Sequence, residues 1–194
     1  MMRYFYQNWA KMTLPLALSI GLILFSSAGK ISWITLLVWL QFPAYLLHEF
    51  EEHAWPGGFK RFFNVEMFHS KNPDLPLNDT IIFWVNILAI WTVFPVCALL
   101  AQNGYPAFGV FLPLFSLFDA TLHIAVGCIK RKYNPGLIAS LFLNYPVGLY
   151  ALFEINRLQG LTTQAVVISL VLALLGHAGI VRFVAPRLKS KNYS

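Results

Sequence analysis

Long apolar stretches constrain this chain more than any other feature of its sequence. Each is about 20 residues long, enough for a helix to cross the hydrocarbon core of a bilayer, and short segments with Gly, Pro or Asn separate them. The mean hydropathy of the chain is +0.62. We therefore predict an all-α fold, a polytopic membrane helical bundle with about six transmembrane helices in a single domain, residues 1–194. The stretches cover residues 12–28, 31–53, 80–101, 106–129, 135–156 and 162–184.

Basic residues predict how the bundle is oriented. The net charge is +6, and all Lys and Arg except Lys30 and Arg157 lie in the N-terminal tail, the second and fourth connections and the C-terminal end. Short cytoplasmic connections are enriched in Lys and Arg, so both termini are predicted to face the cytoplasm. We expect these charges to contact the headgroups of membrane lipids, and we expect no nucleic-acid partner. Alternatively, the first stretch is a cleaved signal peptide.

The second connection contains a short amphipathic segment. In residues 58–68, GFKRFFNVEMF, apolar side chains recur at helical spacing with polar residues between them. This pattern predicts either a short helix in the membrane interface or a loop that rests its aromatic rings on the bilayer. Both arrangements could guide a lipid-like small-molecule substrate to the polar residues that precede the segment. The apolar residues are Phe59, Phe62, Phe63 and Met67.

Polar side chains gather near the predicted cytoplasmic ends of the helices. Ionisable groups are costly inside a bilayer and usually face the bundle interior, so their positions are informative. His48, Glu51 and Glu52 have i, i+3, i+4 spacing at the end of the second stretch, and Asp119 and His123 have i, i+4 spacing on the fourth. Residues at these spacings lie on one side of a helix. Further polar residues at similar depth are Glu49, His53, Asn86, Asn144 and His177.

Imidazole and carboxylate groups that face one another across a bundle are typical metal ligands. We expect a divalent metal, Zn or Fe, whose ligands are His48, Glu52, His123 and His177. Glu51 and Glu52 are the candidate catalytic residues, and their spacing leaves open which one binds the metal and which one is the general base. Positions next to the metal or the substrate are assigned to Glu49, His53, Asn86, Asp119 and Asn144.

Several of these residues have simpler alternative roles. A single histidine on an apolar helix, such as His177, is also typical of a hydrogen-bonded packing residue. Glu49 and His53 could instead extend to the lipid headgroups. Asp119 could orient His123 without binding the metal itself.

The order of these residues resembles a known family. His48, Glu51 and Glu52 reproduce an H-x-x-E-E signature, and further matching features follow it along the chain. On these residues the sequence resembles the HXXEE-motif family of bacterial integral membrane proteins, whose function is not established. The resemblance covers roughly residues 35–180 and implies a bacterial inner (plasma) membrane, but no reaction. The further features are Pro56, Gly57, Asn86, His123 and the segment YNPG at residues 133–136.

Three kinds of function remain open from the sequence. The first is a metal-dependent intramembrane enzyme, a hydrolase of a lipid or lipid-modified substrate at the cytoplasmic leaflet or, with two irons, a lipid oxygenase. The second is a small transporter coupled to protons or cations, in which the acids and imidazoles carry the ion. The third is a structural membrane protein whose buried polar network only specifies packing.

Overall fold

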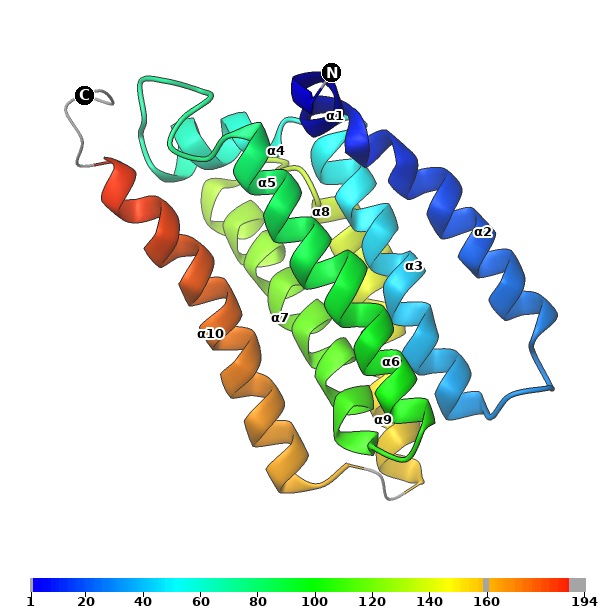
Figure 1. The fold of residues 1–194 in the computed structure, drawn as a ribbon. Coiled ribbons are helices and arrows are strands. Elements are labelled where there is room, and N and C mark those ends of the chain that lie inside the picture. The colour runs from blue at the N-terminus through cyan, green and yellow to red at the C-terminus, as the bar shows by residue number, and fades with distance from the viewer. Residues whose placement is uncertain (1, 159–160, 189–194) are drawn as a thin grey trace.

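The computed structural model describes residues 2–158 and 161–188, and these residues form a bundle of helices (Figure 1). No strand forms among the described residues, where one isolated β-bridge joins Ala28 and Ile31. The predicted all-α class is therefore confirmed. In chain order the elements are α1 (Met2–Asn8), η1 (Trp9–Met12), α2 (Thr13–Ser26), α3 (Trp33–His53), α4 (Phe59–Arg61), η2 (Phe62–Met67), α5 (Asp79–Asn86), η3 (Ile87–Val93), α6 (Phe94–Gln102), α7 (Pro106–Lys130), α8 (Leu137–Ala139), η4 (Ser140–Asn144), α9 (Tyr145–Arg157) and α10 (Thr163–Leu188).

Four helical segments are long and apolar enough to cross a membrane, as expected of a membrane protein. They are Tyr4–Ser26, Asp79–Gln102, Pro106–Lys130 and Leu137–Arg157. α3 and α10 lie where the other two spans were predicted but do not meet both criteria, so the number six stays a prediction. α3 is 21 residues long but carries three glutamates near its end, and the apolar part of α10 is Thr163–Gly179. The short helix predicted in the second connection forms as α4 and η2.

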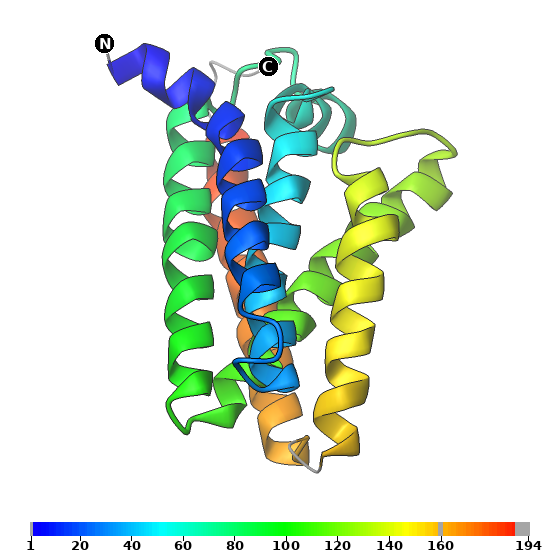
Figure 2. The same cartoon turned by 90° about the vertical axis from the view of Figure 1, so that its right-hand side faces the viewer.

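α3 and α7 are the helices with the most neighbours in the bundle. α2 packs on α3 at one edge, and α10 packs on α7 at the other (Figure 1). The turned view places α9 on the opposite side of α3 from α5 and α6 (Figure 2). The connection that contains α4 and the loop before α8 lie at the same end of the bundle as α1. We call this the α4 end.

Aromatic packing fixes α3 against α6 and α7 in the middle of the bundle. The ring of Tyr45 lies 5.1 Å from the ring of Phe94 and 5.9 Å from the ring of Phe115. Phe94 is fully buried. Contacts between large rings at these separations add to the free energy of apolar burial, so this cluster is a rigid support directly below the polar end of α3.

Widened turns interrupt two of the long helical segments. η3 joins α5 to α6 and η4 joins α8 to α9, and both are π-helical. A proline follows each at the start of the next helix, Pro95 and Pro146. Because proline has no N–H, it removes one i→i−4 hydrogen bond, which favours a wider turn before it. Such turns frequently occur at functional sites.

Candidate metal centre

The last turns of α3 hold the first two residues of the site. His48 and Glu52 are one helical turn apart, and both are buried. The Nε2 atom of His48 lies 3.6 Å from Oε1 of Glu52. Both side chains therefore point from α3 toward the same space.

α7 supplies the facing residues, His123 and Asp119. Nε2 of His123 lies 3.2 Å from Oε1 of Glu52, and Oδ2 of Asp119 lies 3.2 Å from Nε2 of His48. The two residues of α7 are themselves 3.9 Å apart at Nε2 and Oδ2. Two imidazoles and two carboxylates thus converge between α3 and α7.

Three of these side chains could hold a metal ion. Donor atoms of His48, Glu52 and His123 all lie within 4.8 Å of one another. Zinc binds imidazole nitrogen and carboxylate oxygen at about 2.0–2.2 Å in a tetrahedron, which places neighbouring donor atoms about 3.3 Å apart. Nε2 of His48 and Oδ2 of Asp119 are buried, and neither makes a hydrogen bond with the described residues. Buried polar atoms without partners are rare. A cation held by His48, Glu52 and His123 would satisfy Nε2 of His48, with Oδ2 of Asp119 at 3.2 Å from that nitrogen.

Asn134 holds the imidazole of His123 in the orientation that a metal ligand needs. Nδ1 of His123 donates to Oδ1 of Asn134 at 2.8 Å, and Nδ2 of Asn134 donates to the carbonyl of His123 at 2.9 Å. The second bond fixes which end of the amide faces the ring. With its proton on Nδ1, the ring presents the Nε2 lone pair to Glu52, as in metal sites whose histidines are held by a hydrogen-bonded neighbour.

The loop between α7 and α8 touches the site through Gly136. A β-carbon at this position would lie 2.8 Å from Cε1 of His48, 2.8 Å from Cε1 of His123 and 3.0 Å from Cγ of Glu52. The backbone φ is +97°, in the region that favours glycine. Any side chain here would push the imidazoles out of place.

Glu51 lies outside this group. Its Oε1 accepts hydrogen bonds from the hydroxyl of Tyr133 at 2.9 Å and the N–H of Ile138 at 3.0 Å. Its Oε2 accepts from the N–H of Ala139 at 2.6 Å. Burial and the bond to Glu51 raise the pKa of Tyr133. A carboxylate with this many donors holds the start of α8, where helical N–H groups lack partners. The structure does not bring Glu51 to the group formed by His48, Glu52 and His123.

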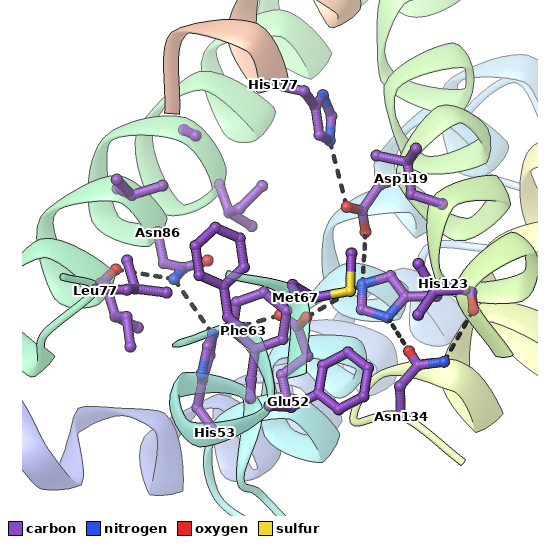
Figure 3. Close-up of a pocket in the computed structure, with 18 of the residues that line it drawn as sticks. Glu52, His53, Phe63, Met67, Leu77, Asn86, Asp119, His123, Asn134 and His177 are labelled. Atoms are coloured by element: carbon purple, nitrogen blue, oxygen red, sulfur yellow. Dashed lines mark hydrogen bonds and ion pairs between the residues drawn. The ribbon is translucent and has the colours of Figure 1, made fainter. Parts of the chain in front are cut away.

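His177 also lies outside the three-residue group. Its Nδ1 donates to the carbonyl of Ala173 at 2.8 Å, and its Nε2 lies 3.3 Å from Oδ1 of Asp119. The predicted metal ligand therefore contacts the site through Asp119, from the neighbouring helix α10 (Figure 3).

Two further predicted residues lie beside Glu52, on the α5 side. Nε2 of His53 is 3.3 Å from Oε2 of Glu52, and Nδ2 of Asn86 is 3.4 Å from the same nitrogen of His53. Both residues line the cavity described below, so the structure brings them to the site (Figure 3).

Glu49 and Asn144 are buried away from the cavity. Oε2 of Glu49 accepts from Nε1 of Trp91 at 2.8 Å, on the side of α3 that faces η3, so Glu49 does not extend to the lipid headgroups. The amide of Asn144 makes no hydrogen bond with the described residues. The structure does not bring either residue to the candidate metal group.

A cavity of about 370 Å³ lies beside the candidate metal ligands. Glu52, Asp119 and His123 form part of its wall, and the rest is mainly apolar and aromatic. Its lining comes from α3, from α4 and η2, from α5 and η3, from α7, and from α10 through His177 (Figure 3). The site is thus open on one side to a volume typical of small-molecule pockets.

A comparison with known protein families found a match. The profile of a family described as "protein of unknown function with HXXEE motif" matches residues 39–151, more than half of the chain. The chain belongs to the HXXEE family. The matched residues include His48, Glu52, His123 and Asn134, whereas His177 lies beyond them. Neither the search of curated proteins nor the search of solved structures found a match.

In this HXXEE protein the residues of the motif have two different environments. His48 and Glu52 face α7, Glu52 also lines the cavity, and Glu51 faces α8. The first and last residues of the motif are thus candidate ligands, while the middle glutamate fixes the loop that carries Asn134 and Gly136.

Two residues of the site were not predicted from the sequence, Asn134 and Gly136. Both belong to the YNPG segment, which reads as a turn because of its Pro and Gly. The residue spacing in a turn does not show whether the turn packs against the side chains between two helices. The sequence therefore predicted the turn but not its contacts with the site.

Proposed function

We propose that this HXXEE protein is a metal-dependent membrane hydrolase that acts on a lipid or lipid-modified substrate. The observation that carries the proposal is the convergence of His48, Glu52 and His123 within 4.8 Å, with Glu52 and His123 in the wall of a largely apolar cavity. Catalytic zinc sites commonly have three protein ligands and keep one position open. The three candidate ligands and the cavity beside them agree with that arrangement.

The residues around this group have distinct roles in the proposal. A divalent ion, zinc or iron, would supply a Lewis acid that activates water. His48, Glu52 and His123 would hold the ion, and Asn134 would keep His123 oriented. Asp119 reaches the cavity between His48 and His177 and would accept a proton from a water molecule there, a role for which the sequence offers Glu51 or Glu52.

The proposed membrane placement follows from charge. The α4 end carries Lys60, Arg61, Lys71 and the Lys130–Lys132 segment, and such basic segments are retained on the cytoplasmic side. We place this end, with both termini, at the cytoplasmic face of a bacterial inner membrane. The candidate metal group then lies near the inner leaflet, within reach of lipid substrates.

Transport is the second candidate function. Asp119 joins His48 to His177 in a buried chain of imidazole and carboxylate groups, and such chains serve as proton relays in transporters. A di-iron oxygenase has less support, because helical di-iron sites use several carboxylates with paired Glu-x-x-His motifs. Among the described residues a single three-residue group could hold a metal.

Metal analysis of the full-length protein without an affinity tag tests the proposal. We expect one bound metal per chain in the wild type, and its loss in Glu52→Gln and His123→Ala. Matched controls are Glu154→Gln, a buried glutamate paired with Arg157, and His69→Ala, an exposed histidine. A folded wild type that binds no zinc or iron would overturn the proposal. So would equal metal content in all four variants.

With metal bound, release of product from lipid esters should depend on Glu52. Proton flux in proteoliposomes that survives removal of the metal, with no lipid turnover, would favour transport instead.

A further inference from the structure

Two sides of the cavity are formed by helices that have different neighbours in the bundle. One wall is formed by α5 and η3, including Val85 and Ala89, and the opposite side by His177 of α10. α10 packs on α7, whereas α5 and η3 pack on α1, α3 and α6. Figure 1 shows α10 at the edge of the bundle, beside α7. The cavity therefore lies in the space that these two walls leave over α7.

The cavity is continuous with the molecular surface on this side. Leu122 of α7 and Met67 of η2 both line it, yet their relative exposures are 42% and 39%. Large apolar side chains that line a cavity and also reach the surface mark a rim. Leu122 belongs to a segment apolar enough to span a membrane, so a bilayer around the bundle would place this part of the rim against lipid.

A roof closes the cavity at the α4 end. Aromatic side chains of α4 and η2, among them Phe59 and Phe63, lie over the polar residues. The roof is held by charged groups on its outer side: Lys132 pairs with Glu66 at 2.6 Å, and Lys130 donates to the carbonyl of Glu66 at 2.8 Å.

A second anchor lies at the start of the roof. Lys60 pairs with Asp79, the first residue of α5, at 2.7 Å. Burial lowers the pKa of Lys60, but the carboxylates of Asp74 and Asp79 outweigh it and raise the pKa above its usual value. These contacts join the roof to the start of α5 and to the end of α7 and the loop after it.

The distribution of polar atoms in the cavity defines the chemistry of a ligand. Carboxylates and imidazoles gather at the wall formed by α3 and α7, and the α5, η3 and η2 walls are mainly apolar. A matching ligand has one polar group and one hydrocarbon part. The volume of about 370 Å³ is at the low end for ligand pockets, which suits one chain and not a whole two-chain lipid.

We infer that the cavity binds one hydrocarbon chain of an amphiphile, which enters sideways from the bilayer between α5–η3 and α10. The polar group of the amphiphile then lies at Glu52 and His123, and this last step rests on the proposed function. Binding of the chain itself depends only on the cavity.

Photolabelling of the full-length protein in lipid nanodiscs tests the inference. The probe is a long-chain fatty alcohol with a diazirine in its chain, and the labelled residues are mapped by mass spectrometry. We expect saturable labelling at Val85, Ala89 and Leu122, which an unlabelled fatty alcohol of the same length competes away. Labelling that is not saturable, or that spreads evenly over the lipid-facing helices, would overturn the inference.

A pair of variants on one helical segment gives a matched control. Ala89→Trp fills the cavity, and we expect labelling to fall at least about tenfold, the change for a loss of about 1.4 kcal/mol of binding. Val96→Trp adds the same ring at a position on α6 that is 46% exposed, and labelling should remain at the wild-type level. Thermal unfolding checks that both variants are folded. Equal labelling in two folded variants would contradict the inference. The competition result on the wild type stands even if Ala89→Trp does not fold.

A variant with a loosened roof distinguishes sideways entry of the chain from entry through the roof. The double variant Lys130→Ala and Lys132→Ala removes both contacts to Glu66. If the chain enters sideways, the rate of labelling should stay unchanged, whereas a faster rate would overturn lateral entry.

The same labelling distinguishes failure of the inference from failure of the hydrolase proposal. Saturable cavity labelling in a wild type without metal would sustain the chain site and reject the hydrolase. Stoichiometric metal without saturable labelling would reject the chain site alone. Glu52→Gln should lose the metal and keep the label, because it alters the polar wall and not the apolar one.

Discussion

Replacing Gly136 with alanine would test how the loop before α8 supports the metal centre. The new methyl carbon would lie 2.8 Å from Cε1 of both His48 and His123, whereas carbon atoms pack best at about 3.5–4.0 Å. Relief of this overlap requires the imidazoles to move by several tenths of an ångström. Overpacking of this kind costs about 1–3 kcal/mol, and the strained φ adds about 1–3 kcal/mol.

Gly104→Ala separates the two costs. Gly104 has φ +96° and no atom within 4 Å of the place that a β-carbon would occupy, whereas Gly136 has φ +97° and three site atoms there. Both variants carry the backbone strain, and Gly136→Ala alone disturbs the ligands. We expect Gly136→Ala to lose about 1–3 kcal/mol more unfolding free energy than Gly104→Ala, and its metal affinity to fall tenfold or more, since tenfold corresponds to about 1.4 kcal/mol. Thermal unfolding and chelator competition measure the two quantities. Equal metal affinity in the two variants would refute the packing argument.

Three other predictions address single contacts. Asn134→Leu keeps the shape of the side chain but removes the acceptor for His123, so metal affinity in chelator competition should fall about 10–100-fold; unchanged affinity would show that the loop does not orient the ring. Glu51→Gln removes the charge that three donors share, so the unfolding temperature should fall at constant metal content, and loss of metal at constant stability would return Glu51 to the metal centre. The hydrogen bond from Lys132 lowers the pKa of Glu66, so their pairing stabilises the folded state above the ordinary carboxyl pKa of about 4.3 and is lost as the pH falls through the lowered value. A double-mutant cycle should therefore show coupling at neutral pH and none at about pH 2, and equal coupling at both would contradict the assignment.

Helical periodicity predicted the pairs that meet in the site, because i, i+4 residues stay on one side of a helix. His48 with Glu52, and Asp119 with His123, were predicted in this way, and the structure brings them together. Glu51 shows the limit of the method. It is adjacent to Glu52, so the two side chains point about 100° apart around the helix axis, one toward α8 and the other toward α7.

The loop contacts were beyond the reach of sequence periodicity. Asn134 and Gly136 act through tertiary contacts of a turn, and turns have no repeating face from which a direction follows. His177 matched the site in depth, but depth alone did not show that Asp119 lies between it and the metal group. For the fold, the lengths of the apolar stretches located the helices, while the π-helical turns before Pro95 and Pro146 divided two of them.

The bonds of Glu51 have a consequence for how the chain is assembled. Its carboxylate is satisfied by the N–H of Ala139, 88 positions further along the chain. While the protein is being synthesised, α3 is complete before α8 exists, so the carboxylate of Glu51 then has no donor from α8. The acidic turn of α3 would therefore wait at the polar boundary of the membrane until α7 and α8 had been inserted. Late docking of α3 would then be the event that brings His48 and Glu52 to His123 and closes the bundle.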